Sequence, residues 1–238
     1  ECSVMSTEIL GDTIDIHGGG ADLEFPHHTN EIAQSEAKTG KTFANYWMHN
    51  GFVNIDNVKM SKSLGNFITV HDALKTLDGQ VLRFFFATQH YRKPINFTEK
   101  AVRDAETNLK YLKNTYEQPF TGNVDAQELQ AFKDKFVVAM DEDFNAANGI
   151  TVVFEMAKWI NSGSYDVSVK QALADMLEVF GIVFIEEVLD AEIEALIQKR
   201  QEARANRDFA TADQIRDQLA AQGIKLLDTK DGVRWTRD

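Results

Sequence analysis

Apolar residues recur at steps of three and four from residue 98 onward, the spacing of one face of an α-helix. The pattern predicts four helices, whose stripes are Val102, Ala105, Leu109, Leu112 and Tyr116; Leu129, Phe132, Phe136 and Met140; residues 150–160; and Val169, Leu173, Met176, Leu177 and Phe180. Turns are expected at 118–123 and 161–164, where Pro, Gly, Asn and Ser gather. Such stripes usually form a core, so we assign the bundle no chemistry. Asp141–Asp143 could suggest a metal site, but we expect it to open the third helix, where carboxylates meet the positive dipole end.

Shorter patterns flank this bundle. Thr69 and Asp72 form a capping-box-like start of a helix that should reach about Leu77, and Gly79 should break it. A buried helix rich in phenylalanine is expected over 81–89. The stretch 90–97 should be a connector, because the residue before Pro94 avoids helical conformations.

The last residues predict a separate small α+β module. A first helix is marked by Leu189, Ile193, Leu196, Ile197 and Arg200. A second helix is expected over 210–221, with Gly223 as the glycine that ends it. Residues 224–228 and 233–235 should then pair as a hairpin around Lys230-Asp231-Gly232.

The first residues carry a different pattern. Residues 13–16 form a short β-branched, alternating stretch, and His17 and three glycines follow at once. Glycines let the backbone approach a ligand closely. Pro26 is expected in the first turn of a helix. Strand, glycine turn and helix form a nucleotide-site layout, in which Asp22 could accept hydrogen bonds from ribose hydroxyls or an amino group.

Three residues of this N-terminal part, Cys2, His27 and Glu31, are candidate metal ligands. His27 and Glu31 stand four residues apart, so they share one helix face. Cys2 is the only cysteine, and thiolate ligands favour zinc. A fourth ligand would come from water, a substrate atom or a residue outside this chain. The alternative is that His27 caps a helix and Cys2 is a buried apolar residue.

Lys59-Met60-Ser61-Lys62-Ser63 places two ammonium groups on one loop. Such a loop can close on a triphosphate and stabilise charge that develops during displacement. We expect the loop to be mobile, because like charges repel. An ordinary lysine-rich loop is the alternative, but it would not explain the residues around it.

The pentapeptide KMSKS is the signature of class I aminoacyl-tRNA synthetases, and the chain resembles the cysteinyl-tRNA synthetases in particular. The resemblance covers all 238 residues and includes the segments ECS, HGGGADLEFPHHTNEIAQSEA, NYWMHNGFVNIDNVKMSKSLGN and HYRKPINF. It implies catalytic roles for Lys59 and Lys62, and a zinc ion on Cys2, His27 and Glu31. It also implies ATP, accompanied by magnesium, on Lys62, His17, Gly19 and Asp22.

The resemblance implies that an N-terminal half of the enzyme is missing as a partner. The chain starts at Glu1, where we expect a strand, and it contains neither an H-x-G-H segment nor a second cysteine. Without that half the chain should not form cysteinyl-adenylate. Its zinc should also be weak or lost, because three ligands hold an ion less well than four.

The resemblance also implies the fold class and the division of the chain. We expect an α/β remnant of a class I Rossmann-like catalytic domain, then a mainly α-helical bundle and a small α+β C-terminal module. The remnant, with the zinc and KMSKS motifs, should span 1–66, and a connector that contacts the tRNA stem 67–97. The helical bundle, of the anticodon-binding type, should span 98–188, and the small anticodon-recognition module 189–238.

Net charge and composition limit the classes of partner that the chain could bind. The net charge of −12 argues against a general nucleic-acid binder. Residues 191–238, called the tail below, however carry nine basic and nine acidic residues. RNA should therefore bind most easily to this part, which lacks the acidic excess. A single cysteine and the absence of a long apolar stretch suit a cytoplasmic protein without membrane contact. We expect a monomer.

Within the tail, the resemblance implies that Arg204, Phe209, Asp213 and Asp228 read the anticodon. The residue types suit base recognition, because arginine can fork onto guanine, aspartate accepts from exocyclic amines, and an aromatic ring stacks on a base. The alternative is that Arg204 and Asp213 pair on helix surfaces.

The resemblance implies a fragment of a cysteine–tRNA ligase. The complete enzyme would activate cysteine with ATP to an adenylate and transfer it to tRNA(Cys), and this half would supply the zinc ligands, the KMSKS loop and the tRNA-binding domains. Two alternatives stay open. The isolated chain could be a non-catalytic tRNA-binding module. It could also be a cysteine ligase of the mycothiol-synthesis type, which shares the zinc and KMSKS motifs but lacks an anticodon module.

Overall fold

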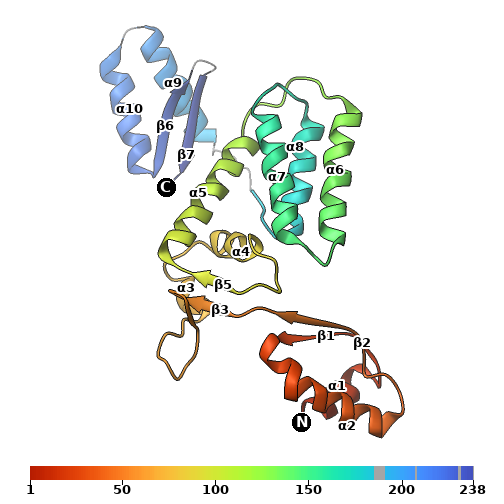
Figure 1. Cartoon of the computed structure of the whole chain (residues 1–238). Coiled ribbons are helices and arrows are strands. Elements are labelled where there is room, and N and C mark those ends of the chain that lie inside the picture. The colour runs from red at the N-terminus through yellow and green to blue at the C-terminus, as the bar shows by residue number, and fades with distance from the viewer. Residues whose placement is uncertain (185–190, 207, 230–231, 238) are drawn as a thin grey trace. The chain divides into compact units, whose positions relative to one another are not determined.

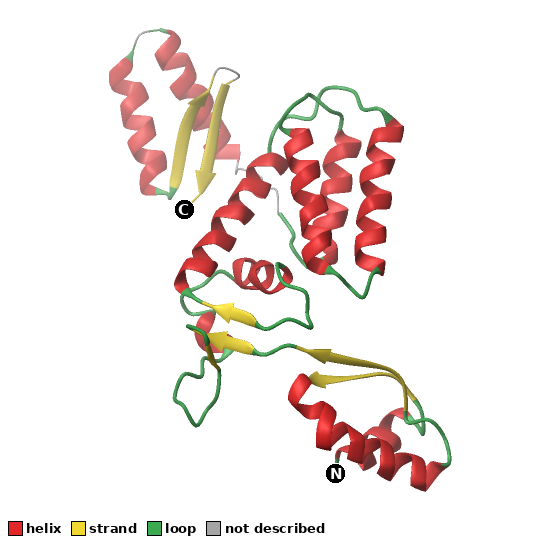
Figure 2. Cartoon of the chain, in the orientation of Figure 1, coloured by secondary structure: helices red, strands yellow, loops and turns green. Residues whose placement is uncertain are grey.

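The structure is a computed structural model, which describes residues 1–184, 191–206, 208–229 and 232–237 (Figures 1 and 2). Contacts divide the chain into two compact units, Glu1–Phe184 and Ile185–Asp238. Helices predominate, and the strands described form small sheets of two or three members (Figure 2). The predicted fold class is therefore correct. No helix among the described residues is both long and apolar enough to cross a membrane.

The first unit begins with an α/β layer made of α1 (Cys2–Leu10), β1 (Ile14–Gly20), α2 (Thr29–Thr39) and β2 (Ala44–Asn50). β1 and β2 are parallel neighbours, and α1 packs on α2 (Figure 1). The expected strand at Glu1 is wrong. The buried side chains of α1, Ser3 and Thr7, lie one helical turn apart, and Ser3 Oγ donates to Gln34 Oε1 of α2 at 3.0 Å.

The helix expected from Pro26 begins later. Pro26 lies in a short wide turn, η2 (Glu24–His28), which follows the 3₁₀ turn η1 (Ala21–Leu23), and the regular helix starts only at Thr29. Phe25 is extended, with φ −139° and ψ 134°, as expected for the residue before a proline. His27 and Glu31 nevertheless keep their spacing of one turn.

A second sheet carries the lysine loop. β3 (Val53–Ile55) pairs with β4 (Val58–Lys59) through a hairpin turn and with β5 (Ile95–Phe97) in parallel. β5 lies in the stretch that was expected to be a connector. Its pairing with β3 depends on a contact between distant parts of the sequence, which local patterns do not reveal.

The elements after the lysine loop follow the prediction in part. Thr69 accepts a hydrogen bond from the backbone of Asp72, which confirms the cap, but α3 spans only Val70–Ala73. Gly79 does not end a helix and instead is the first residue of α4 (Gly79–Ala87), which Asp78 caps. The phenylalanine-rich helix is confirmed, with Phe84 fully buried.

The four predicted helices are α5 (Glu99–Tyr116), α6 (Ala126–Asp141), α7 (Ala146–Ile160) and α8 (Val167–Val179), which pack together (Figure 1). Their stripes form one core with α4, and Leu112, Met156 and Leu173 are among its fully buried residues. The periodicity therefore predicted both the helices and the faces that they bury.

The acidic run between α6 and α7 does not open α7. Asp141 ends α6, and Asn145 caps α7 by accepting a hydrogen bond from the backbone of Asn148. Asp143 and Phe144 have positive φ values of 57° and 52°, so the chain reverses between the helices. The expected helix start was wrong: the carboxylate of Asp143 accepts hydrogen bonds from Arg92, and Asn145 takes the capping position instead.

The second unit contains α9 (Ala191–Ala205), α10 (Phe209–Ala221), β6 (Ile224–Thr229) and β7 (Gly232–Arg237). Ile193, Ile215, Leu219 and Ile224 form its small core. Gly223 follows α10 with φ 77°, as predicted, and β6 and β7 form the predicted hairpin. The expected turn residues Lys230 and Asp231 lie outside the described residues.

Candidate metal and nucleotide site

The three predicted ligands lie together. One ligand atom from each of Cys2, His27 and Glu31 falls within 4.8 Å of the others. Cys2 comes from the first turn of α1, Glu31 from α2, and His27 from the turn before it. His27 Nε2 lies 3.7 Å from Glu31 Oε1, while Cys2 is exposed and not the buried residue of the alternative interpretation.

Glu31 is the chemically unusual member of this group. It is 3% exposed, and neither carboxylate oxygen accepts a well-formed hydrogen bond among the described residues. Burying a carboxylate that only histidine nitrogens face is costly, whereas a bound cation would compensate both oxygens. A cysteine, a histidine and this carboxylate are also a donor set that zinc accepts. The residues present therefore fit a zinc ion.

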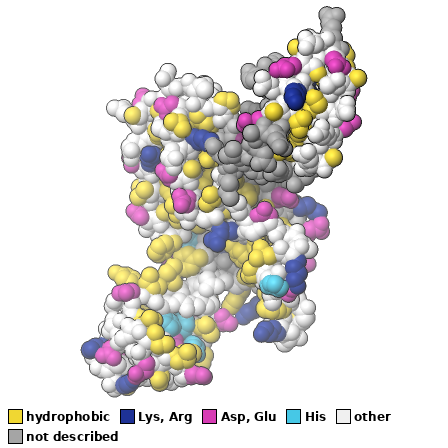
Figure 3. Space-filling view, turned by 180° about the vertical axis from the view of Figure 1, so that it is seen from behind, with side chains coloured by type: hydrophobic (Ala, Val, Ile, Leu, Met, Phe, Trp, Pro, Cys, Tyr) yellow, Lys and Arg dark blue, Asp and Glu magenta, His cyan; other side chains and the backbone are white. Residues whose placement is uncertain are grey.

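Glu31 also faces a second set of possible ligands, His17 and His28. His17 Nε2 lies 2.8 Å from Glu31 Oε2, whereas His27 lies nearer the other oxygen. His28 Nδ1 lies 2.8 Å from His49 Nε2, and Trp47 packs against both His17 and His28. Burial lowers the pKa of His28, which favours the neutral ring. Histidine side chains reach the surface over this part of the molecule (Figure 3).

His28, His49 and Trp47 were not predicted from the sequence. His28 follows a predicted ligand directly, which was a usable signal. His49 and Trp47 join the group only because β2 lies beside β1, with Gly19 opposite His49 and His17 opposite Trp47.

The glycine run lies at the end of β1, close to the histidine group. A Cβ on Gly19 would lie 2.9 Å from His28 Cε1 and from Leu23 Cδ1, so a side chain there would displace the histidine. Asp22 follows in η1, and its Oδ2 lies 3.6 Å from Lys59 Nζ. The structure thus brings Asp22 and Lys59 together from two segments, and both were predicted to act on the nucleotide.

The two loop lysines have different surroundings. Lys59, at the end of β4, lies over the Phe52 ring at 3.7 Å as well as near Asp22. Lys62 lies 5.5 Å from the Phe67 ring, and no carboxylate of the described residues is within 4 Å of its ammonium group. Asn66 closes the loop by accepting from Ser61 N and donating to Lys59 O. The mobility of the loop stays a prediction.

The predicted anticodon residues lie in the second unit. Arg204 is in the last turn of α9, and Phe209 begins α10 with 61% of its surface exposed. Asp213 lies 3.0 Å from Arg216 on the same helix, so its carboxylate has a cationic partner. Asp228 is on β6, opposite Val233 in the hairpin register.

Comparison with known proteins places this geometry in a family. The family model described as "tRNA synthetases class I (C) catalytic domain" matches residues 1–107, a "DALR domain" matches 135–184, and a "Cysteinyl-tRNA ligase anticodon binding domain" matches 186–235. A protein of Streptococcus pneumoniae serotype 4 named cysteine–tRNA ligase is 96% identical over the whole chain. The chain belongs to the cysteinyl-tRNA synthetase family. A family member from Streptococcus mutans serotype c is 82% identical, again over all 238 residues.

The chain spans about half the length of these cysteinyl-tRNA synthetases, namely 53% of each. Among solved structures, the LeuRS of Agrobacterium radiobacter K84, in a ternary complex with tRNA and LeuAMS, is similar with a TM-score of 0.50. That likeness covers 71% of this chain and 27% of the LeuRS at 14% identity, so it supports the fold alone.

Proposed function

We propose that this chain forms part of a cysteine–tRNA ligase and supplies its metal ligands, its lysine loop and its tRNA-binding parts. The main support is one juxtaposition. The Asp22–Lys59 contact brings the intact KMSKS loop to the turn after β1, and the same stretch continues through His27 into α2, which carries Glu31. The functional division proposed is 1–66, 67–97, 98–188 and 189–238.

Cys2, His27 and Glu31 would hold zinc, and the buried carboxylate of Glu31 supports this assignment. When bound, the ion would supply a Lewis acid that prefers the substrate thiolate of cysteine over the hydroxyl of serine. His17 and His28 pack against the same site. They would orient Glu31 and exclude water from it.

The nucleotide would lie along the strand end. Gly19 would present its backbone to the nucleotide, while its missing side chain leaves room for the His28 ring. Asp22 would accept from the ribose or the adenine amine. His17 would line the same side. Lys59 and Lys62 would neutralise the triphosphate, with magnesium accompanying ATP, while cysteine displaces pyrophosphate to form the adenylate. The acyl group would then pass to tRNA(Cys).

Aminoacylation tests this function directly. The chain should be mixed with the rest of the Streptococcus pneumoniae relative, expressed as a second polypeptide, and assayed for cysteine-dependent pyrophosphate exchange and charging of tRNA(Cys). Activity in the mixture, and none in the chain alone, is expected. If the mixture binds tRNA(Cys) but shows neither reaction, the chain is a tRNA-binding module instead. Charging of an amino-sugar rather than tRNA would favour the mycothiol-type ligase, which the match to an anticodon-binding domain opposes.

The tail offers a separate prediction. We propose that Arg204, Phe209, Asp213 and Asp228 contact the tRNA anticodon, since Phe209 exposes a ring available for stacking. Phe209→Ala should weaken binding of the tRNA(Cys) anticodon stem-loop by about 1–3 kcal/mol. Arg204→Ala should cost about 1–3 kcal/mol and relax discrimination at guanine. Fluorescence titration with cognate and guanine-substituted stem-loops measures both.

A control keeps the tail prediction specific. Lys41→Ala removes an exposed cation that pairs with Asp12, outside both the bundle and the tail, and should leave the affinity unchanged. Equal binding of both stem-loops by the wild type would contradict anticodon reading. We also propose that the protein is a cytoplasmic monomer. Sedimentation of the purified chain measures its mass in solution and so tests whether it is monomeric.

A further inference from the structure

The turn between α6 and α7 has an unusual backbone. Asp143 and Phe144 follow one another with φ values of 57° and 52°, in the left-handed region. Residues other than glycine adopt that region at a cost, although Asp and Asn tolerate it best. A turn of this kind persists where other contacts determine it. The side chain of Asp143 supplies such contacts.

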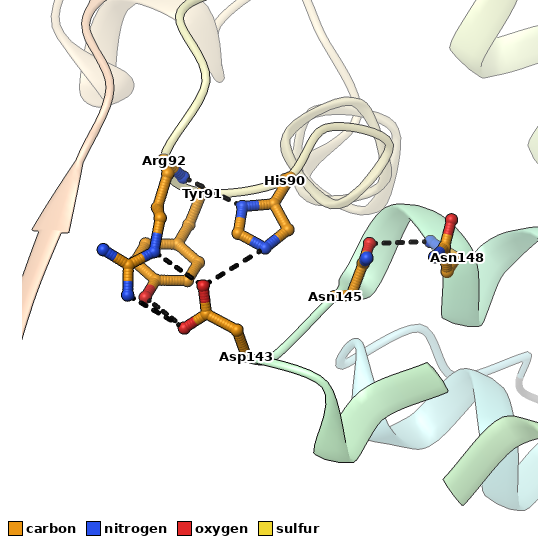
Figure 4. Close-up of polar contacts among 6 residues, drawn as sticks. All are labelled: His90, Tyr91, Arg92, Asp143, Asn145 and Asn148. Atoms are coloured by element: carbon orange, nitrogen blue, oxygen red, sulfur yellow. Dashed lines mark hydrogen bonds and ion pairs between the residues drawn. The ribbon is translucent and has the colours of Figure 1, made fainter. Parts of the chain in front are cut away.

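The Asp143 carboxylate is the centre of a polar cluster with the turn 90–92 (Figure 4). Arg92 Nε donates to Oδ2 at 2.6 Å and its second nitrogen, Nη2, donates to Oδ1 at 3.1 Å, which makes a bidentate fork. Tyr91 Oη donates to Oδ1 at 2.7 Å. His90 Nε2 lies 3.6 Å from Oδ2, and the His90 ring stacks on Tyr91. Three consecutive residues thus converge on one carboxylate.

These contacts stay intact over a wide pH range. The Arg92 guanidinium and the Tyr91 hydroxyl lower the pKa of Asp143 from 3.8 to about 2. Because this pKa is depressed, the contribution of these contacts to folding stability is fully present above 3.8, the pKa of Asp143 in the unfolded chain. It is lost as the pH falls through about 2. The cluster is therefore formed whenever the protein is in a neutral buffer.

The opposite side of the turn 90–92 meets the strands of the candidate site. Gly51 N donates to Tyr91 O at 2.7 Å, and a Cβ on Gly51 would lie 2.4 Å from the Lys93 backbone. Gly51 joins β2, which carries Trp47 and His49, to β3, which leads into Lys59. The turn 90–92 is thus held between the bundle and the junction of the two site strands.

We propose that Asp143 is a positioning residue, which fixes the helical bundle against the strands of the metal and lysine-loop site through Tyr91 and Arg92. The proposal rests on the proposed function. In that function the bundle holds tRNA, while the strands hold the adenylate, so the orientation of the bundle relative to the strands sets where the tRNA 3′ end arrives. Adenylate formation needs no such alignment, because both reactants lie on the strand side.

Asp143→Asn tests this role with little disturbance of the turn. Asparagine keeps the shape and tolerates the left-handed conformation, but it removes the charge that the Arg92 fork binds. In the mixture with the rest of the Streptococcus pneumoniae relative, the kcat for charging tRNA(Cys) should fall about 10- to 100-fold. Pyrophosphate exchange should stay within about twofold of the wild type. Asp143→Glu should restore part of the charging rate.

The matched control is Asp141→Asn, which removes the same charge two residues away. It should change neither reaction. Equal losses in charging and pyrophosphate exchange, or equal effects of Asp141→Asn and Asp143→Asn, would show that Asp143 only stabilises the fold or adds general charge.

A measurement on the chain alone separates this proposal from the proposed function. Hydrogen exchange at the Gly51 amide, which donates to Tyr91, should become about tenfold faster in Asp143→Asn, with α7 amides unchanged. If the mixture is inactive but this change appears, the ligase function fails and the Asp143 contact stands. If Gly51 exchange is unchanged, the positioning role is wrong whatever the activity.

Discussion

Glu31→Gln is expected to lower the affinity of the chain for zinc by at least about 100-fold, because outer-shell partners alone are worth about 10- to 100-fold and Glu31 would bind the ion directly. The amide also lacks the charge that a cation compensates in the buried site. Glu31 is 3% exposed, and only His17 Nε2 at 2.8 Å and His27 Nε2 at 3.7 Å lie near its oxygens, so a bound cation would stabilise the wild-type carboxylate. Competition titration with a chromophoric chelator measures the change.

Two further variants make this test specific. Glu8→Gln on α1 alters an exposed carboxylate that pairs with Lys38, and it should leave zinc affinity unchanged. Cys2→Ser decides which ligand set holds the ion. Cobalt bound through Cys2 should show a thiolate charge-transfer band that disappears in Cys2→Ser. If the wild-type chain binds cobalt without such a band, and Cys2→Ser leaves the cobalt affinity unchanged, the ion lies on His17, His28 and Glu31.

Local patterns predicted the parts of the fold that depend on local spacing. The stripes of α5 to α8 were correct because a helix repeats every 3.6 residues whatever it packs against. The ligand pair His27 and Glu31 likewise needed only one helical turn. It survived although the regular helix starts at Thr29 and not at Pro26.

Long-range pairing could not be predicted in the same way. The His28–His49 contact and the His17–Trp47 packing require the parallel register of β1 and β2. Asp143 shows the same limit, since its partner Arg92 lies 51 residues away. The local context of Asp143 favoured a helix start, and a distant arginine fork determined the turn instead.

The second large effect is expected at the lysine loop. Lys62→Ala should lower kcat for cysteine-dependent pyrophosphate exchange about 10²- to 10³-fold in the mixture with the rest of the Streptococcus pneumoniae relative. The magnitude follows from removing one preorganised charge that stabilises a developing phosphate charge. Lys62 is the better candidate for this role, because its ammonium group is 5.5 Å from the Phe67 ring and has no carboxylate neighbour among the described residues. Lys59 is held near Asp22 and Phe52.

Lys75→Ala is the matched control, because it removes an exposed lysine that pairs with Asp72 at 2.6 Å outside the loop. It should leave the rate within about twofold. The KM for cysteine should change little in Lys62→Ala, since the lysine would act on the triphosphate and the metal ligands would bind the thiol. If Lys62→Ala instead raises only the KM for cysteine and leaves kcat intact, Lys62 acts in ground-state binding of the amino acid. That result would contradict its role in the displacement.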